Sequence, residues 1–140
     1  MSDLHLAARA KRAIAAEPAG RAPLVELLAD VDHLVLLGDV LELREAPLSD
    51  ALAAAEPAFR ALGEALGGAR VTIVPGNHDH QLADPLLDAH RLDPAGGSLP
   101  VDASMPAPAS GPLGRLAGWL GDSELTLAYP GTWTLQWISL

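Results

Sequence analysis

Residues 71–80 read Val-Thr-Ile-Val-Pro-Gly-Asn-His-Asp-His, and the rest of the chain can be understood from this stretch. Its first four residues are all β-branched, and such a run is typical of a buried strand. A Pro-Gly pair interrupts the strand pattern, and Asn77, His78 and Asp79 come directly after it. In α/β proteins, polar residues just past the carboxyl end of a strand commonly form a site. The stretch therefore predicts a buried strand that delivers polar side chains to a site.

Two other segments have the same layout. Residues 33–37, His-Leu-Val-Leu-Leu, are mostly apolar and run directly into Gly38, Asp39 and, three residues on, Glu42. The chain opens with Asp3 and His5. Carboxylate, amide and imidazole groups are the ligands that divalent transition metals prefer in mixed oxygen and nitrogen sites. Three segments that each supply such groups predict a metal site.

The ordered series Asp-x-His at residues 3–5, Gly-Asp-x-x-Glu at 38–42 and Gly-Asn-His-Asp at 76–79 resembles the first three motifs of the calcineurin-like metallophosphoesterase superfamily. Members of that superfamily carry two metal ions. The resemblance implies that Asp3 and His5 bind one ion, that Asp39 bridges both ions, and that Asn77 binds the second. A carboxylate can bridge ions about 3.5–4 Å apart, and the neutral Asn carbonyl limits the accumulated negative charge. The ions would be of the Mn, Fe, Zn or Ni class.

The resemblance also implies the chemistry. A hydroxide that bridges the two ions would attack phosphorus in phosphate mono- or diesters, so the expected activity is that of a metal-dependent phosphoesterase. His78 is similar to the family's proton donor to the leaving oxygen, and we expect Asp79 beside it to hold the imidazole and raise its pKa. For Glu42 we expect a supporting hydrogen bond rather than direct ligation.

The alternation of strand and helix patterns predicts an α/β fold with a small, mainly parallel sheet and flanking helices. Leu52, Ala55, Phe59, Leu62 and Leu66 form one apolar stripe, which predicts a helix that ends at the glycines 67–68. The proline at residue 57 predicts a kink there, or two abutting helices.

Weaker patterns predict the remaining elements. Helices are expected over residues 6–14, over 24–28 with Pro23 in the first turn, from Asp84 onwards, and over 113–120. A strand is expected over 125–129, where apolar residues alternate with Thr126 and Ala128.

Residues 93–112 are rich in Pro, Gly, Ala and Ser and lack apolar periodicity. We expect a flexible excursion within one domain that spans residues 1–140, because residues 113–140 are too few to form a second domain. The family's strand before Asp3 and its later Gly-His-x-His motif are not found in the sequence. The resemblance therefore predicts an incomplete metallophosphoesterase-type sandwich, a fragment truncated at both ends.

Composition narrows the possible partners. The chain has 140 residues, 49% of them hydrophobic, which is enough for one core. Its 9 basic and 18 acidic residues give a net charge of −9, which argues against a surface that follows a nucleic-acid backbone. Cysteine is absent, so the sequence predicts neither disulfides nor thiolate metal sites. No signal-like or membrane-spanning run is found, and we expect a cytoplasmic protein that acts on a phosphate ester without a membrane partner.

One alternative to the enzyme stays open: a non-catalytic truncated domain that acts as an interaction or regulatory module. Three further histidines also have more than one interpretation. His80 adjoins the site motif and either lines the substrate mouth or lies on the surface, whereas His90 is expected on a solvated helix face. His33 lies at the start of its strand, remote from the site, and is expected at the surface or the sheet edge.

Overall fold

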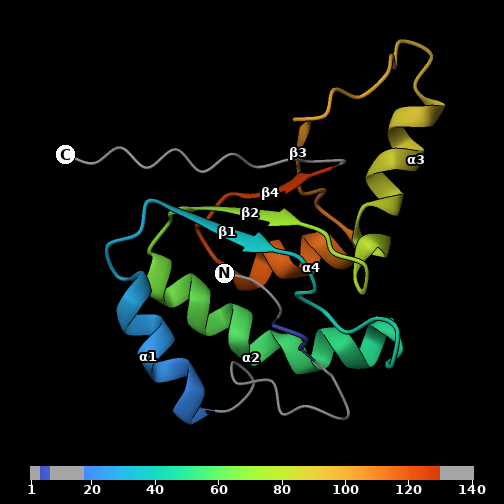
Figure 1. Cartoon of the computed structure of the whole chain (residues 1–140). Helices are drawn as coiled ribbons and strands as arrows, with labels where there is room; N and C mark the ends of the chain where they lie inside the picture. Colours follow the sequence, from blue (N-terminus) through green and yellow to red (C-terminus); the bar gives the residue numbers. More distant parts are fainter. Residues whose placement is uncertain (1–3, 7–17, 130–140) are drawn as a thin grey trace.

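The computed structural model describes residues 4–6 and 18–129 of the chain. Four strands form one sheet in the order β1-β2-β4-β3 (Figure 1). The strands β1 (His33–Leu37), β2 (Arg70–Val74) and β4 (Leu125–Ala128) run parallel to one another, and β3 (Ser104–Pro106) pairs antiparallel with β4. The predicted α/β class with a small, mainly parallel sheet is therefore confirmed.

Helices cover one face of this sheet. Figure 1 shows α1 (Pro18–Leu28), α2 (Leu48–Leu66) and α4 (Gly111–Trp119) on the same side of the strands. Helix α2 connects β1 to β2, so these strands run in the same direction and both end at the same edge of the sheet. Two further helical segments, η2 (His80–Leu82) and α3 (Asp84–Leu92), follow β2 on the way to β3.

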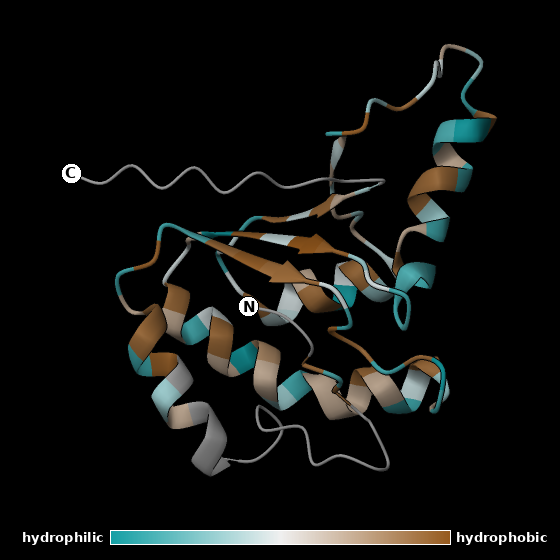
Figure 2. Cartoon of the chain, in the orientation of Figure 1, coloured by the Kyte–Doolittle hydropathy of each residue, from teal (hydrophilic) through white to brown (hydrophobic). Residues whose placement is uncertain are grey.

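The core lies between the sheet and these helices. In β1, Leu34 and Leu36 are buried, whereas Val35 is less buried and Leu37 is half exposed, as expected of a strand with one covered face. Figure 2 shows brown, apolar segments on the strands and on the helix surfaces that face them. Burial of each such leucine contributes about 1.5–3 kcal/mol, so this layer supplies most of the stability of the fold.

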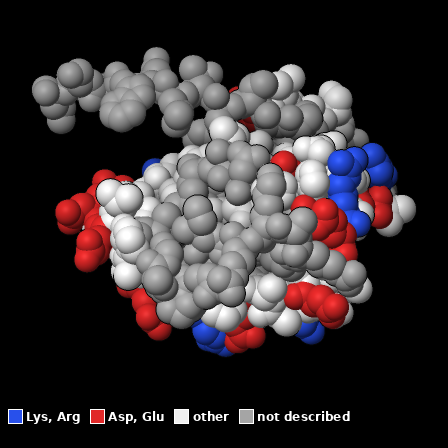
Figure 3. Space-filling view, turned by 60° about the horizontal axis from the view of Figure 1, so that its bottom comes forward, with Lys and Arg blue, Asp and Glu red and all other residues white. Residues whose placement is uncertain are grey.

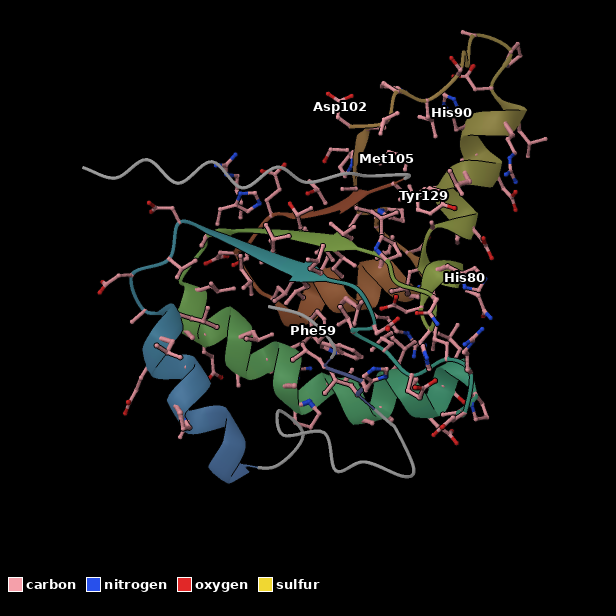
Figure 4. All side chains as sticks on the ribbon, in the orientation of Figure 1. Phe59, His80, His90, Asp102, Met105 and Tyr129 are labelled. Carbon is pink, nitrogen blue, oxygen red and sulfur yellow. The ribbon has the colours of Figure 1, made fainter. Side chains whose placement is uncertain are left out.

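Helix α2 provides the largest part of the helical side of the core. The whole predicted stripe is buried, and Phe59 lies between α2 and the sheet in Figure 4. Gly67 ends the helix in a left-handed conformation and its N–H bonds to the Gly63 carbonyl. The helix is single, so the alternative of two abutting helices is wrong. Pro57 and Ala53, whose carbonyl loses its helical partner, are both exposed, where water can replace the missing bond.

Several predicted boundaries differ from the structure. Helix α1 begins at Pro18, so Pro23 lies inside it rather than in its first turn. The stretch predicted as an excursion contains β3, a short strand that exists only through its pairing with β4. The helix predicted over 6–14 lies mostly outside the described residues. Among the residues described, no helix is both long and apolar enough to cross a membrane.

Candidate metal centre

Two loops meet at the carboxyl edge of the parallel strands. The first, residues 38–42, follows β1, and the second, residues 75–79, follows β2; together they are called the edge loops below. The Gly38 N–H donates to the Val74 carbonyl at 2.8 Å, which joins the loops where they leave the sheet. Because β1 and β2 are parallel, Asp39 and Asn77 follow strands that end at the same edge of the sheet.

Asp39 has an unusual backbone conformation. Its φ is 50°, and Gly38 before it has φ of 72°. A residue with a side chain adopts this left-handed region at a cost of about 1–2 kcal/mol, so other contacts must hold Asp39 there. The backbone of Gly76 packs directly against Asp39. A Cβ at residue 76 would collide with the Asp39 carboxylate and backbone nitrogen. Glycine is therefore required at this position.

The third segment of the site, residues 4–6, lies beside the first edge loop. The N–H of His5 donates to the Asp39 carbonyl at 2.8 Å, and Leu6 forms an isolated parallel bridge with Leu41. This pairing brings the His5 imidazole to the same edge as Asp39. Asp3, the remaining predicted ligand, lies outside the described residues.

Glu42 joins the two histidines of the site. The residue is buried, with 2% exposure, and its carboxylate contacts Nδ1 of His78 at 2.7 and 2.8 Å and Nδ1 of His5 at 3.1 Å. The two rings stand edge to face with centroids 4.9 Å apart. Glu42 thus contacts both imidazoles, and its contact with His5 is one that the sequence did not indicate.

Charge and tautomer follow from these contacts. Burial alone would raise the pKa of the Glu42 carboxyl, but hydrogen bonds from His78, His5 and the Arg44 N–H together hold that pKa below its ordinary value. Glu42 is thus ionised near neutral pH and can only accept hydrogen bonds. Each imidazole then donates from Nδ1, so that Nε2 is the nitrogen that carries the lone pair when the ring is neutral.

Two sets of ligand atoms at the centre could bind a divalent ion, and the first consists of His5 and Asp39. His5 Nε2 lies 3.9 Å from Asp39 Oδ2. Two ligands bonded to the same ion at about 2.1 Å can be at most about 4.2 Å apart, so both atoms can reach one ion. A second donor set shares His5: ligand atoms of His5, Glu42 and His78 all lie within 4.8 Å of one another. Both sets combine imidazole with carboxylate, the chemistry of transition-metal sites.

The structure corrects the expected role of Asp79. The residue is fully buried, and its carboxylate accepts hydrogen bonds from the backbone N–H groups of Val40, Leu41 and Gly76, at 2.7, 3.2 and 2.7 Å. The carboxylate that contacts the His78 imidazole is that of Glu42. Residues 77–79 form a turn, in which the Asp79 side chain is buried while that of His78 is only partly buried and contacts Glu42.

The other predicted polar residues lie around this centre. Asn77 is exposed on the second edge loop. Figure 4 shows His80 beside that loop and His90 near the far end of α3. His80 is exposed and contacts the Asn77 carbonyl at 3.4 Å, whereas His90 contacts the Gly97 carbonyl at 2.7 Å. Neither is brought to the histidine pair.

Two features of the centre are not indicated by the sequence motifs. The first is the Gly76 approach to Asp39, although a glycine directly before a polar cluster is a signal that backbone packs closely there. The second is the set of backbone N–H groups that bind Asp79, which carry no side-chain signal.

A family model described as calcineurin-like phosphoesterase matches residues 1–132. No curated protein matches the chain, and no solved structure does. The family match covers most of the chain and includes all three motifs that contribute to the centre.

Proposed function

The chain belongs to the calcineurin-like phosphoesterase family, and we propose that it is a metal-dependent hydrolase of phosphate mono- or diesters. One observation carries the proposal: Asp39, His5 and His78 converge at the sheet edge, with Glu42 between the two imidazoles. These are the residues that the family motifs mark for metal binding and proton transfer.

The first ion would be held by His5 Nε2 and Asp39, with Asp3 as a further ligand. We prefer this set to the one that includes Glu42, because Glu42 already accepts hydrogen bonds from Nδ1 of both rings, so that Nε2 of His5 is the nitrogen that would bind the ion. A carboxylate that orients a metal-binding imidazole is a common arrangement. A second ion would share Asp39 and take Asn77 as its other ligand.

When bound, the ions would supply Lewis-acid chemistry at the phosphoryl group and a nucleophile from water at neutral pH. His78, with both ring nitrogens protonated, would donate the Nε2 proton to the leaving oxygen; the Glu42 carboxylate at Nδ1 stabilises the protonated ring before this transfer and orients the neutral ring after it. The Asp39 carboxylate, held by the backbone of the opposite loop, keeps its position during this transfer.

The acidic surface of the chain is consistent with a site that uses bound cations to attract a phosphate ester. The chain carries a net charge of −9, and Figure 3 shows acidic side chains on both sides of the face that it presents, with few basic ones. Such a surface repels a phosphate ester at long range. Divalent ions at the centre would offset this repulsion where the ester binds.

The test is hydrolysis of bis(p-nitrophenyl) phosphate and p-nitrophenyl phosphate by the chain with Mn²⁺. We expect turnover that chelation removes and Mn²⁺ restores, and that Asp39→Asn abolishes. Because the first ion has more protein ligands than the second, a calorimetric titration should show one tighter and one weaker binding step. Hydrolysis that survives chelation, or that Asp39→Asn leaves intact, would contradict the proposal.

The role of His78 needs a second comparison. His78→Ala should keep the bound metal and slow an ester with a poor leaving group more than an activated aryl ester, because only the former needs a proton. Equal slowing of both esters would remove His78 from this role.

A further inference from the structure

Asp79 is the one fully buried carboxylate among the described residues, and it is neither a predicted metal ligand nor in contact with the His78 ring. We propose that Asp79 is a positioning residue: it holds the first edge loop in the conformation that directs Asp39 towards the ion. This inference rests on the proposed function, because it assigns Asp79 a role in that metal site.

The hydrogen bonds of Asp79 join the two edge loops. Oδ2 accepts from the N–H groups of Val40 and Leu41 in the first loop, and Oδ1 accepts from Gly76 in its own loop. An ionised carboxylate buried without a paired cation is costly unless several donors compensate. Three charge-assisted bonds to backbone N–H groups provide that compensation, and they are about twice as strong as neutral ones. The carboxylate therefore fixes the spacing of the loops.

The donors to Asp79 depend on the conformation of Asp39. Successive backbone N–H groups in a turn can converge to form a concave anion site. Gly38 and Asp39 are both left-handed, and the next two N–H groups are those that bind Oδ2. The anion and the left-handed turn thus stabilise each other. Without the carboxylate, the first loop loses the partner that offsets the strain at Asp39.

The second loop also fixes the Asp39 side chain. The His78 N–H donates to Asp39 Oδ1 at 2.9 Å, which leaves Oδ2 as the oxygen that lies 3.9 Å from His5 Nε2. Backbone and side chain of Asp39 are thus both set by the loop that Asp79 anchors. A change at Asp79 should therefore be measurable as a change in metal affinity, although Asp79 does not touch the ion.

The experiment compares Asp79→Asn with Leu62→Ala in the full chain. Asn keeps the shape but replaces one accepting oxygen by an amide that cannot accept. Leu62 is buried in α2 and makes no contribution to the centre, so Leu62→Ala is the control for loss of stability alone. Binding of Mn²⁺ is measured by electron paramagnetic resonance at a temperature at which all variants are folded. We expect Asp79→Asn to weaken Mn²⁺ binding at least about tenfold, with Leu62→Ala within about twofold of the parent.

A metal-free readout separates this inference from the proposed function. In the parent chain without metal, the N–H groups of Val40 and Leu41 should be protected from hydrogen exchange, and Asp79→Asn should remove that protection while Leu62→Ala keeps it. Absence of Mn²⁺ binding in the parent would contradict the proposed function. Parent-like Mn²⁺ affinity or retained protection in Asp79→Asn would overturn the role of Asp79. If Asp79→Asn does not fold, Asp79→Glu is tested in its place. We then expect the same weaker Mn²⁺ binding and the same loss of protection, and parent-like affinity or retained protection would again overturn the role of Asp79.

Discussion

The edge loops and the segment after them differ in the range of their contacts. Several side-chain hydrogen bonds of the edge loops join partners more than 35 positions apart, such as Glu42 with His78 and Asp79 with Val40. Residues 84–102, called the arm below, comprise α3 and the connection towards β3, and Figure 1 shows them standing away from the sheet. Polar contacts in the arm, such as that of His90 with Gly97, are local, and α3 has no buried residue.

This difference in contact range predicts which residues are conformationally coupled to one another. Long-range polar contacts couple the conformation of one edge loop to that of the other, so a change in one should be felt in both. Local contacts in the arm constrain only the arm itself. Equivalent substitutions in the two regions should therefore have very different effects.

The largest contrast is expected between two glycines. Gly76→Ala places a methyl group against the Asp39 carboxylate and backbone, and we expect it to lower the free energy of unfolding by about 1–3 kcal/mol and to abolish Mn²⁺ binding. Gly97→Ala in the arm, where a Cβ meets nothing within 4 Å, should change stability by less than about 0.5 kcal/mol and leave Mn²⁺ binding intact. Denaturant unfolding and metal titration measure both. Similar effects of the two substitutions would contradict the claim that the edge loops are more tightly constrained than the arm.

The next contrast is between two carboxylates. Glu42→Gln weakens bonds to two imidazoles in a buried position, and we expect a loss of about 2 kcal/mol in the free energy of unfolding. Asp88→Asn removes only an exposed contact with Arg91 at 3.4 Å, so less than about 0.5 kcal/mol should be lost. Urea unfolding at neutral pH compares them. A loss for Asp88→Asn as large as that for Glu42→Gln would contradict this expectation.

The pH dependence of stability sharpens the Glu42 prediction. The folded pKa of Glu42 lies below its unfolded value of about 4.3. Its contribution to stability is therefore complete above the unfolded value and is lost as the pH falls through the folded one. The parent should lose stability relative to Glu42→Gln across this acid range. Parallel profiles of the two proteins below about pH 4 would show that Glu42 contributes no such linkage.

The smallest effect is expected at His33, at the opposite end of β1. Burial, with a smaller contribution from Arg70, lowers the pKa of His33, and its Nε2 lies 2.9 Å from Thr72 Oγ1. The folded state therefore favours the neutral ring, so stability should be complete above the unfolded pKa of about 6.5 and decline as the pH falls below it. His33→Gln should flatten this part of the profile without changing Mn²⁺ binding. An unchanged slope between about pH 6.5 and 5 would contradict the prediction.

The sequence is sufficient for elements whose burial is periodic. The stripe on α2 and the strands β1 and β2 are predictable because packing against a single core leaves a regular pattern. The short strand β3 is not predictable in this way, because its three residues are ordered by antiparallel pairing with β4, which no local pattern records. The start of α1 differs from the prediction because Pro23, a residue typical of a first helical turn, lies inside the helix.

The candidate centre is predictable to the level of its motifs. Asp39, His78 and Glu42 can be identified because their chemistry is visible in the residue types. The role of Asp79 cannot, since two of its partners are backbone N–H groups of a loop that lies far away in the sequence. The contact between Glu42 and His5 likewise depends on how residues 4–6 pair with the first edge loop.

The measurement that tests the central claim most directly is the ¹⁵N spectrum of the imidazole rings with bound ¹¹³Cd²⁺ as a probe of the metal site. We expect Cd²⁺ to couple to Nε2 of His5, while Nδ1 of His5 keeps its proton and its contact with Glu42. Coupling of Cd²⁺ to Nδ1 of His5 and His78 would show that Glu42 and the two rings bind the ion instead. That result, or an absence of coupling to His5, would contradict the proposed centre.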